Sequence, residues 1–225
     1  MSVGPRRQRD KRDRMKIGIL GAGNMGGTLG RLWTELGHEV FFGLRDAESV
    51  KAQRALTAVG DEAQWGTAAA AAEFADVILI AVPWEATQEV IESIAPQLAG
   101  KVLIDCTNPI EPDLSGLAIG HTTSAAEEIA RWAPEARVVK AFNTIGASTL
   151  HDAKFGDHSA SVFVCGNDEP AKKIVGQLAE EIGFEVIDAG QLTMARYLEP
   201  LAMLWIHLAI RGKFGSKIAV KLLRR

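Results

Sequence analysis

Apolar and polar positions along the chain alternate between two patterns. Short continuous apolar runs, typical of strands buried on both faces of a parallel sheet, recur along its whole length. They occupy residues 16–20, 39–43, 64–66, 76–82, 101–105, 137–142, 161–165 and 184–188. Amphipathic or helix-forming segments follow them at residues 29–36, 46–59, 68–72, 87–98, 124–132, 168–182, 191–210 and 211–225. The alternation predicts an α/β fold with a doubly wound, mostly parallel sheet and a small helical carboxy-terminal extension.

The first apolar run leads directly into the sequence Gly21-Ala22-Gly23-Asn24-Met25-Gly26. Its glycines have the spacing G-x-G-x-x-G, and each one has its own physical role. Gly21 permits a tight turn, Gly23 leaves room for a pyrophosphate beside the backbone, and Gly26 lets the next helix pack against the strand. The helix that follows offers free N–H groups and the positive end of its dipole. This predicts a Rossmann-type nucleotide site; the alternative is a purely structural glycine turn.

The second apolar run ends in Leu44-Arg45-Asp46, at the position that distinguishes NAD from NADP. An NAD site usually has an acidic residue there, whereas arginine suits the extra phosphate of NADP. Arg45 can form charge-assisted bonds to a 2′-phosphate and stack on adenine. We therefore favour NADP over NAD, with a solvated surface arginine as the alternative, and we expect Asp46 to begin the next helix.

The fourth apolar run ends in Ala81-Val82-Pro83-Trp84, beside the first strand of the predicted sheet. In such folds the crevice at this point receives the nicotinamide. Trp84 either walls the ring or packs under a helix, and the sequence leaves both interpretations open. Residues 110–123 are rich in Gly, Pro and polar side chains, and we expect a loop of the kind that often covers a site.

Composition narrows the class of protein without naming an activity. The chain has 225 residues with a net charge of −3, so nothing in its overall charge indicates nucleic acid. Two cysteines, Cys106 and Cys165, lie far apart without a C-x-x-C motif, which favours a reduced, cytoplasmic protein over one with a reactive Cys106 thiol. No run is long enough to be a membrane span. Residues 1–14 read as a disordered basic tail or an arm for an anionic partner, and translation starts at either Met1 or Met15.

Other side chains with chemical potential are scattered. His121 and His151 are isolated in polar loops, where a general acid or metal ligand is the less favoured interpretation. His207 lies in an apolar run, and we expect it to be packed. Met194 and Met203 more often fill a core than line a flat-ring pocket. The sequence indicates no metal site, and no catalytic acid, base or nucleophile in the crevice.

Several motifs occur together in a fixed order. They are residues 16–27, Ala81-Val82-Pro83-Trp84, Lys140-Ala141-Phe142-Asn143-Thr144-Ile145, Val164-Cys165-Gly166-Asn167-Asp168 and Asp188-Ala189-Gly190. In combination they resemble the NADPH-dependent coenzyme F420 reductase family (F420:NADP oxidoreductases), and are similar to the amino-terminal domain of STEAP-type metalloreductases. The resemblance covers residues 15–225.

The resemblance implies an NADP-binding Rossmann domain at residues 15–190 and a helical extension at 191–225 that supplies an acceptor pocket and an oligomer contact. Hydride would pass directly from the nicotinamide to F420, FMN or FAD, with no protein acid or base. Carried over by position, the pyrophosphate site is Gly21, Ala22, Gly23, Asn24, Met25 and Gly26. The 2′-phosphate site is Arg45 with Leu44, where the family commonly has serine or threonine. The nicotinamide site is Ala81, Val82 and Pro83. The acceptor-ring site is Ala141 with Asn143, where the family often has histidine.

Two other functions remain open from the sequence. One is a pyrroline-5-carboxylate reductase or 3-hydroxyacid dehydrogenase relative, although such enzymes add a large helical domain. The other is a non-enzymatic NADP-binding sensor. An apolar stripe of Phe214, Ile218, Leu222 and Leu223 on the predicted last helix further indicates a homodimer.

Overall fold

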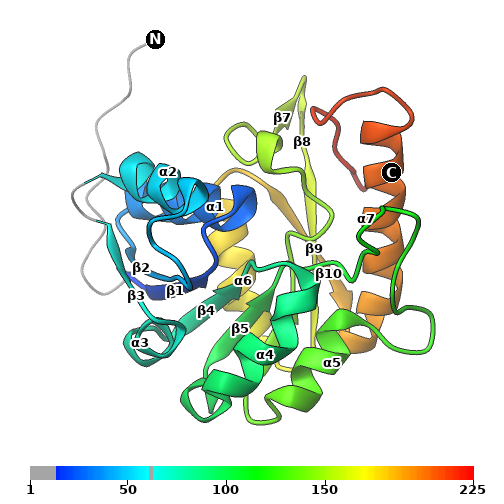
Figure 1. Cartoon of the computed structure of the whole chain (residues 1–225). Coiled ribbons are helices and arrows are strands. Elements are labelled where there is room, and N and C mark those ends of the chain that lie inside the picture. The colour runs from blue at the N-terminus through cyan, green and yellow to red at the C-terminus, as the bar shows by residue number, and fades with distance from the viewer. Residues whose placement is uncertain (1–13, 61–62) are drawn as a thin grey trace.

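The protein folds around one mixed sheet of eight strands (Figure 1). The computed structural model describes residues 14–60 and 63–225, so the predicted tail lies, apart from Arg14, outside the described residues. The strands in spatial order are β10 (Glu185–Gly190), β9 (Ser161–Gly166), β6 (Arg137–Lys140), β5 (Val102–Asp105), β4 (Val77–Ile80), β1 (Lys16–Leu20), β2 (Glu39–Gly43) and β3 (Gln64–Gly66). Strand order therefore reverses between β1 and β4, as in other doubly wound folds.

Helices cover both faces of the sheet. The main ones are α1 (Asn24–Glu35), α2 (Val50–Val59), α3 (Ala68–Phe74), α4 (Trp84–Ile94), α5 (Ala125–Trp132), α6 (Glu169–Glu181) and α7 (Ala195–Ile210). Side chains of α1 and α6 join one core cluster, which includes Trp33 and Val175. Those of α3, α4 and α5 join a second cluster, which includes Ile91 and Ile129. The two clusters lie on opposite faces of the sheet, since Ile19 belongs to the first and its neighbour Leu20 to the second.

Local signals set most boundaries of these helices. Ser124, Ser49 and Thr67 each accept a hydrogen bond from a backbone N–H three residues later, as helix N-caps do. At Ser124 the first half of the predicted capping box is present, since its hydroxyl accepts the Glu127 N–H at 3.2 Å; the Glu127 carboxylate accepts from the same hydroxyl at 2.8 Å. The second helix begins at Val50, four residues later than predicted, because Asp46 accepts a bond from the Glu48 N–H and Ser49 takes the cap.

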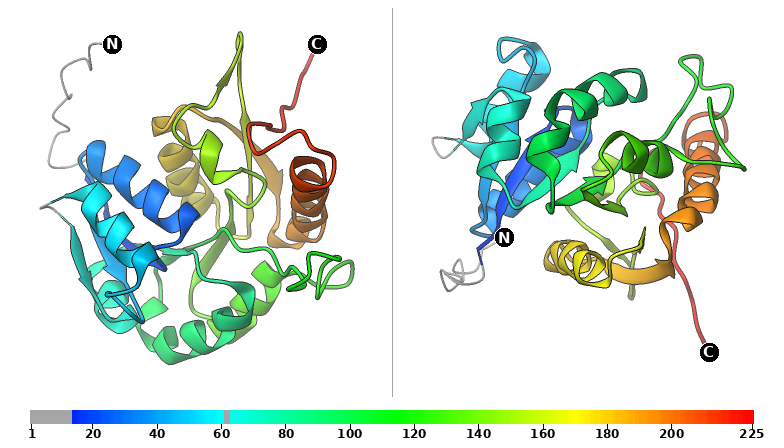
Figure 2. Two further views of the ribbon diagram at one scale, coloured as in Figure 1. Left: turned by 45° about the horizontal axis from the view of Figure 1, so that its top comes forward. Right: turned by 90° about the horizontal axis from the view of Figure 1, so that it is seen from below.

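In the second half of the chain the mostly parallel sheet is confirmed, and the predicted last helix is wrong. First, the antiparallel pair of the main sheet is β6 with β9, whereas β9 and β10 are parallel to each other. A short hairpin of β7 (Lys154–Phe155) and β8 (His158–Ser159) precedes β9 and turns the chain back. Second, residues 211–225 are not helical. Helix α7 ends at Ile210, and positive φ angles of 60° at Lys213 and 73° at Gly215 turn the chain that follows into an extended tail (Figure 2).

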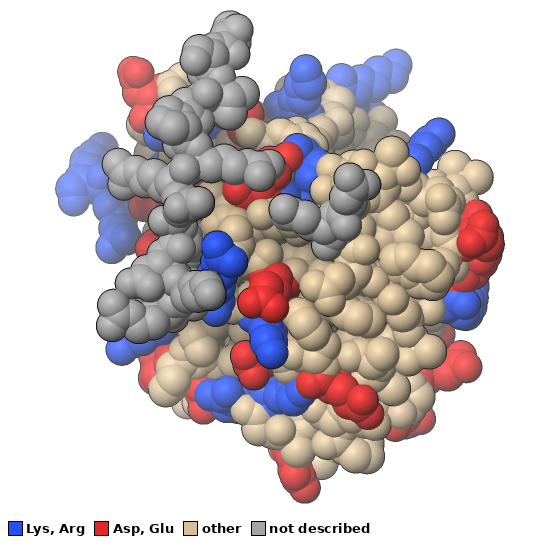
Figure 3. Space-filling model, turned by 90° about the vertical axis from the view of Figure 1, so that its left-hand side faces the viewer, with Lys and Arg blue, Asp and Glu red and all other residues tan. Residues whose placement is uncertain are grey.

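The exposed face beside α2, β3 and α3 carries charges of both signs (Figure 3). Basic and acidic side chains lie next to one another there, around a wide uncharged area. Among the described residues, no helix combines the length and the apolar character needed to cross a bilayer.

Candidate functional site

The glycine turn between β1 and α1 has the geometry that its spacing predicts. Gly21 has a φ of 102°, and a Cβ there would lie 2.6 Å from the carbonyl oxygen of Ala81. At Gly26 a Cβ would lie 2.1 Å from the carbonyl oxygen of Gly21. A Cβ at Gly23 would meet nothing within 4 Å. Gly21 and Gly26 are therefore required by packing, whereas Gly23 borders open space that a side chain would enter.

The first turn of α1 is suited to an anion. Gly23 is the N-cap residue and forms no side-chain cap, and the first turn contains no acidic residue. N–H groups at such a helix start are left for another acceptor, and the helix dipole favours negative charge there. Asn24 is exposed, and Ala22 and Met25 are half-buried around the turn. The residues present therefore fit a pyrophosphate.

Arg45 lies at the end of β2 with its side chain exposed. Leu44 is half-buried, packs against the core, and donates its N–H to the Gly66 carbonyl at 2.9 Å. Asp46 is committed to the local turn before α2. Within residues 14–60 and 63–225, no ion pair or hydrogen bond engages the Arg45 guanidinium. Arg45 is therefore available to an anionic ligand beside the glycine turn.

The segment after β4 lies directly against the glycine turn. The Ala81 N–H donates to the Leu20 carbonyl at 2.9 Å. A Cβ placed on Gly21 would lie 3.0 Å from Cγ1 of Val82. Ala81 and Val82 are half-buried, and Pro83 is exposed at the start of α4. The structure thus brings the predicted pyrophosphate and nicotinamide segments together at the carboxyl ends of β1 and β4.

Trp84 packs between helices. Its ring stacks on that of Trp132 in α5, with centroids 5.6 Å apart and an interplanar angle of 28°. Of the two interpretations that the sequence left open, the structure favours packing between α4 and α5 over a wall for a bound ring.

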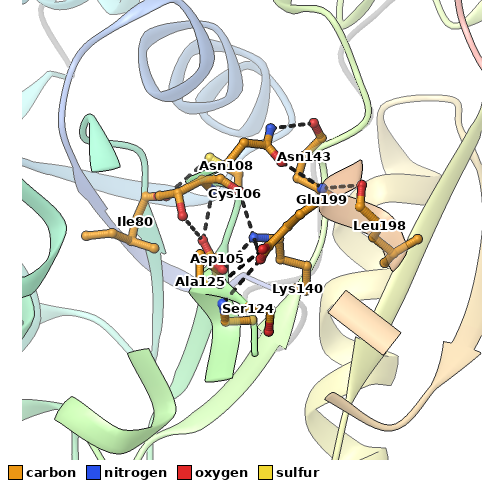
Figure 4. Close-up of polar contacts among 12 residues, drawn as sticks. Ile80, Asp105, Cys106, Asn108, Ser124, Ala125, Lys140, Asn143, Leu198 and Glu199 are labelled. Carbon is orange, nitrogen blue, oxygen red and sulfur yellow. Dashed lines mark hydrogen bonds and ion pairs between the residues drawn. The ribbon is translucent and has the colours of Figure 1, made fainter. Parts of the chain in front are cut away.

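A buried polar cluster lies at the carboxyl ends of β5 and β6 (Figure 4). Nζ of Lys140 lies 2.8 Å from Oδ2 of Asp105 and 2.7 Å from Oε1 of Glu199, and it donates to the Thr107 carbonyl at 2.7 Å. None of the three charged side chains has exposed surface. Oε2 of Glu199 accepts the Ala125 N–H at 3.0 Å, at the start of α5. The cluster therefore ties two strands to α5 and α7.

Burial and charge act against each other in this cluster. Burial disfavours the charged amine, but the carboxylates of Asp105 and Glu199 outweigh it and hold the pKa of Lys140 above its ordinary value. Burial raises the pKa of Glu199, and the neighbouring Lys140 opposes that shift. We expect all three groups to stay engaged with one another rather than to exchange protons with a substrate.

Asn143 joins a second polar junction beside this cluster (Figure 4). Its Nδ2 donates to Oδ1 of Asn108 and to the Leu198 carbonyl, each at 3.0 Å, and Nδ2 of Asn108 donates to the Asn143 carbonyl at 2.9 Å. The Asn143 and Leu198 carbonyls can only accept, so these partners fix both amide orientations. Asn143 is 6% exposed and Ala141 is fully buried, whereas Asn108 is half-buried. Of these three, Asn108 has the most surface available to a ligand.

Sequence reasoning did not single out Asp105, Asn108, Lys140 or Glu199. A signal existed, because Lys140 and Glu199 are charges inside apolar runs and Asp105 ends another. A charge in a segment that must be buried requires a partner. The three charges together therefore indicate a shared site, although only the fold shows which pairs meet.

Both cysteine thiols are buried. Cys106 donates its S–H to the Ile80 carbonyl at 3.2 Å, and burial raises its pKa to about 12. The alternative of a reactive Cys106 is therefore wrong. Burial also raises the pKa of Cys165 to about 12.

The remaining candidate side chains differ in their surroundings. Nδ1 of His151 lies 2.6 Å from the guanidinium of Arg31, so it accepts a hydrogen bond. His121, in the 110–123 loop, lines a 230 Å³ pocket with Met203 of α7. His207 is exposed, which contradicts the expected packing, because it faces away from the sheet on α7. Among the described residues, no three His, Cys, Asp or Glu side chains are grouped so as to hold a metal.

Comparison with known proteins assigns the chain to a family. A family model described as NADP oxidoreductase, coenzyme F420-dependent, matches residues 16–109. The F420-dependent NADP reductase of Methanothermobacter marburgensis is 35% identical over 215 residues, which cover 90% of this chain and 96% of that protein. This chain belongs to the F420-dependent NADP reductase family. The resemblance stated from the motifs is thereby confirmed.

Other similarities agree with membership in this reductase family. A crystal structure assigned to an F420-dependent NADP reductase from Arthrobacter sp. FB24 has a TM-score of 0.84 and 35% identity, covering 93% of this chain and 100% of that one. The metalloreductase STEAP3 of Rattus norvegicus is 34% identical over 188 residues, and this chain spans 36% of its length. A pyrroline carboxylate reductase from Plasmodium falciparum, with 15% identity and a TM-score of 0.58, shares the fold alone.

Proposed function

We propose that this protein transfers a hydride directly between the nicotinamide of NADP(H) and the deazaflavin ring of F420, with FMN or FAD as weaker acceptors. The observation that carries this proposal is the anion-binding turn with the free Arg45 beside it, in a chain that matches an F420-dependent NADP reductase over 96% of that protein. The turn accounts for a dinucleotide, and Arg45 accounts for its extra phosphate.

We assign the cofactor-binding residues by their positions in the family's motifs, and the geometry of the glycine turn supports the assignment. Backbone N–H groups of the glycine turn would hold the pyrophosphate, with Gly21, Ala22, Gly23, Asn24, Met25 and Gly26 around it. Arg45 would bind the 2′-phosphate, and Leu44 would pack beside the ribose without contributing a hydroxyl. Ala81, Val82 and Pro83 would lie along the nicotinamide. Ala141 and Asn143 would shape the acceptor side from beneath, since both are buried and Asn143 acts through Asn108.

The chemistry requires alignment rather than proton transfer by the protein. Nicotinamide and deazaflavin supply a hydride donor and acceptor when both are bound. The protein holds the phosphates, fixes the ring-binding segments, and keeps water away through the apolar side chains of Ala81, Val82 and Pro83. The buried charges beneath the crevice are paired with one another, as expected for a scaffold rather than for an acid or base.

The test of this function is spectroscopic. We expect NADPH and oxidised F420 to lose their absorbance together when the purified protein is added, under anaerobic conditions. FMN and FAD should be reduced more slowly. NADPH that binds without reducing any of the three acceptors would instead support the NADP-binding sensor.

The runner-up activities have weaker support. Pyrroline carboxylate reductase and the imine reductases match at 20% identity or less, so they share only the fold. This chain covers 67% of the pyrroline carboxylate reductase, whose larger size agrees with an additional domain. Reduction of a cyclic imine at a rate above that of F420 would reverse the ranking.

We also propose a homodimer that forms through α7. The predicted apolar stripe of Phe214, Ile218, Leu222 and Leu223 requires a helix, but residues 211–225 are not helical. These four side chains therefore do not form the helical dimer contact that the sequence predicted. An exposed apolar stripe instead runs along α7, through Tyr197, Leu204 and Leu208. Light scattering at micromolar concentration should give twice the 24.2 kDa mass of the chain, and Leu204→Lys should restore the single mass.

The unpaired, buried cysteines support a reducing compartment, and we place the protein in the cytoplasm. The division into a nucleotide domain at residues 15–190 and an extension at 191–225 is part of the same proposal. Its support is that α7 packs over the acceptor side, through Leu198 and Glu199.

A further inference from the structure

The extended tail makes specific contacts with four other parts of the fold: β9, the segment after β6, α7 and β10, the last through an ion pair of Lys221 with Glu185. We call residues 216–222 the strap. At its far end the strap lies beside the start of β9. The Ser161 N–H donates to the Val220 carbonyl at 2.9 Å, and Oγ of Ser161 accepts the Leu222 N–H at 3.1 Å. Strand β6 pairs with β9 only at Cys165 and Gly166, so the strap bonds β9 where β6 does not reach.

At its near end the strap meets the segment after β6. Oγ of Ser148 donates to the Ser216 carbonyl at 2.8 Å. The indole N–H of Trp205, on α7, donates to the Ile218 carbonyl at 2.9 Å. The strap therefore orients the Trp205 side chain and bonds directly to the turn that contains Ser148.

The Trp205 ring and the Ser216 carbonyl of the strap both lie against Gly146. A Cβ at Gly146 would lie 2.6 Å from both Cζ2 and Cη2 of Trp205, and 3.3 Å from the Ser216 carbonyl oxygen. No side chain fits between them. Gly146 is buried and lies three residues after Asn143, in the same segment at the carboxyl end of β6. That segment is thus held at Asn143 by Asn108 and Leu198, and at Gly146 by Trp205 and the strap.

The strap is held by these hydrogen bonds and by an ion pair of Lys221 with Glu185 of β10. A 220 Å³ apolar cavity, lined by Trp205, Leu208, Phe214 and Ile218, separates part of it from α7. Within the strap, Ala219 packs against the main core on one side and lines this cavity on the other, together with Ile218 and Val220. Loss of the indole hydrogen bond should release Trp205 from its position on Gly146.

We infer that the strap is a positioning element: it holds Trp205 against Gly146 and so fixes residues 141–146, the acceptor side of the crevice. Trp205 is then a positioning residue for the acceptor and not for NADP(H), whose glycine turn follows β1, separated from β6 by β5 and β4 in the sheet. The kinetic consequence rests on the proposed function, whereas the effect on residues 141–146 does not.

Hydrogen–deuterium exchange tests the structural part without any activity. We compare truncation after Gly215, which removes the strap, with truncation after Leu222, which keeps every strap contact described above. The first should speed exchange in a peptide covering residues 141–150 and leave residues 21–30 unchanged, and the second should change neither. Unchanged exchange at 141–150 in a folded protein that lacks the strap would overturn the inference.

Kinetics then separate a positioning role from a general loss of stability. In the strap truncation we expect the KM for the acceptor to rise on the order of tenfold, since small misplacements reduce productive alignment. The Kd for NADPH should stay within about twofold. An equal loss of affinity for both would contradict a role confined to the acceptor side. If the intact protein reduces no acceptor, the proposed function is wrong, and the exchange data alone decide the strap.

Full-length variants give the same test if the truncated protein does not fold. Trp205→Phe keeps an aromatic ring against Gly146 but loses the bond to Ile218, and should raise exchange at residues 141–150. Gly146→Ala should raise the acceptor KM through its clash with the indole. The same substitution in a Trp205→Leu background should add nothing further, because the clash has been removed. If the effects of the two substitutions on the acceptor KM were additive, the contact between Gly146 and Trp205 would not be the cause of the change, and the inference would be wrong.

Discussion

Nζ of Lys140 lies 2.7 Å from Oε1 of Glu199, and neither side chain has any exposed surface. The contact joins β6 to α7 across 59 residues of sequence. Asp105 completes the cluster from β5, so one ammonium group is shared by two carboxylates from different elements. This arrangement seats α7 on the sheet beside the proposed acceptor side of the crevice.

We expect removal of the ammonium to be strongly destabilising. Lys140→Met leaves Asp105 and Glu199 buried without a counter-charge, which should cost about 3–5 kcal/mol in the free energy of unfolding. Urea denaturation with matched m-values measures the difference. Lys173→Met, on the exposed side of α6, is the control and should change stability by less than about 0.5 kcal/mol. Equal stabilities of the two variants would show that the buried cluster contributes little.

The same ammonium predicts a pH dependence at the alkaline end. The folded-state pKa of Lys140 lies above the 10.5 of an unfolded lysine. Its contribution is therefore fully present below pH 10.5 and is lost as the pH rises through the folded-state value. The stability difference between the wild type and Lys140→Met should be constant from pH 8 to about pH 10 and should shrink above that. A difference that grows with pH would contradict the sign.

Arg45 should decide which nicotinamide cofactor binds. Arg45→Ala should weaken NADPH binding on the order of tenfold or more and leave NADH binding unchanged, because only NADPH has the 2′-phosphate. Isothermal titration calorimetry with both cofactors measures this. Arg45→Lys should fall in between, since it keeps the charge but loses the planar fork. Arg54→Ala, an exposed arginine of α2, is the control. An equal loss for both cofactors would place Arg45 outside the phosphate site.

Two glycines of the same turn should separate binding from folding. Gly23→Ala points a methyl group into open space, so stability should be nearly unchanged while NADPH affinity falls. Gly26→Ala places its methyl group 2.1 Å from the Gly21 carbonyl and should destabilise the fold by about 1–3 kcal/mol. Thermal unfolding and cofactor titration of both variants check this. If Gly23→Ala bound NADPH as tightly as the wild type, the pyrophosphate would have to lie elsewhere.

The amino acid sequence determined the nucleotide turn and most of the elements. The roles of Gly21, Gly23 and Gly26 are set by local geometry. The positive φ and the close approach of a strand to the helix that follows it depend on residues near in sequence. The capping signal at Ser124 is local for the same reason. These features could be predicted because their energetics lie within a few residues of the chain.

Only the tertiary structure decided the rest. Lys140, Asp105 and Glu199 each stand out as a charge in an apolar run, but their pairing depends on how β5, β6 and α7 assemble. The tail reads as an amphipathic helix, yet Lys213 and Gly215 turn it aside and Ser161 supplies its hydrogen-bond partner. The antiparallel direction of β9 relative to β6 is likewise seen only in the assembled sheet. These features depend on contacts between residues that are far apart in sequence. The pattern of apolar and polar positions along the chain therefore could not predict them.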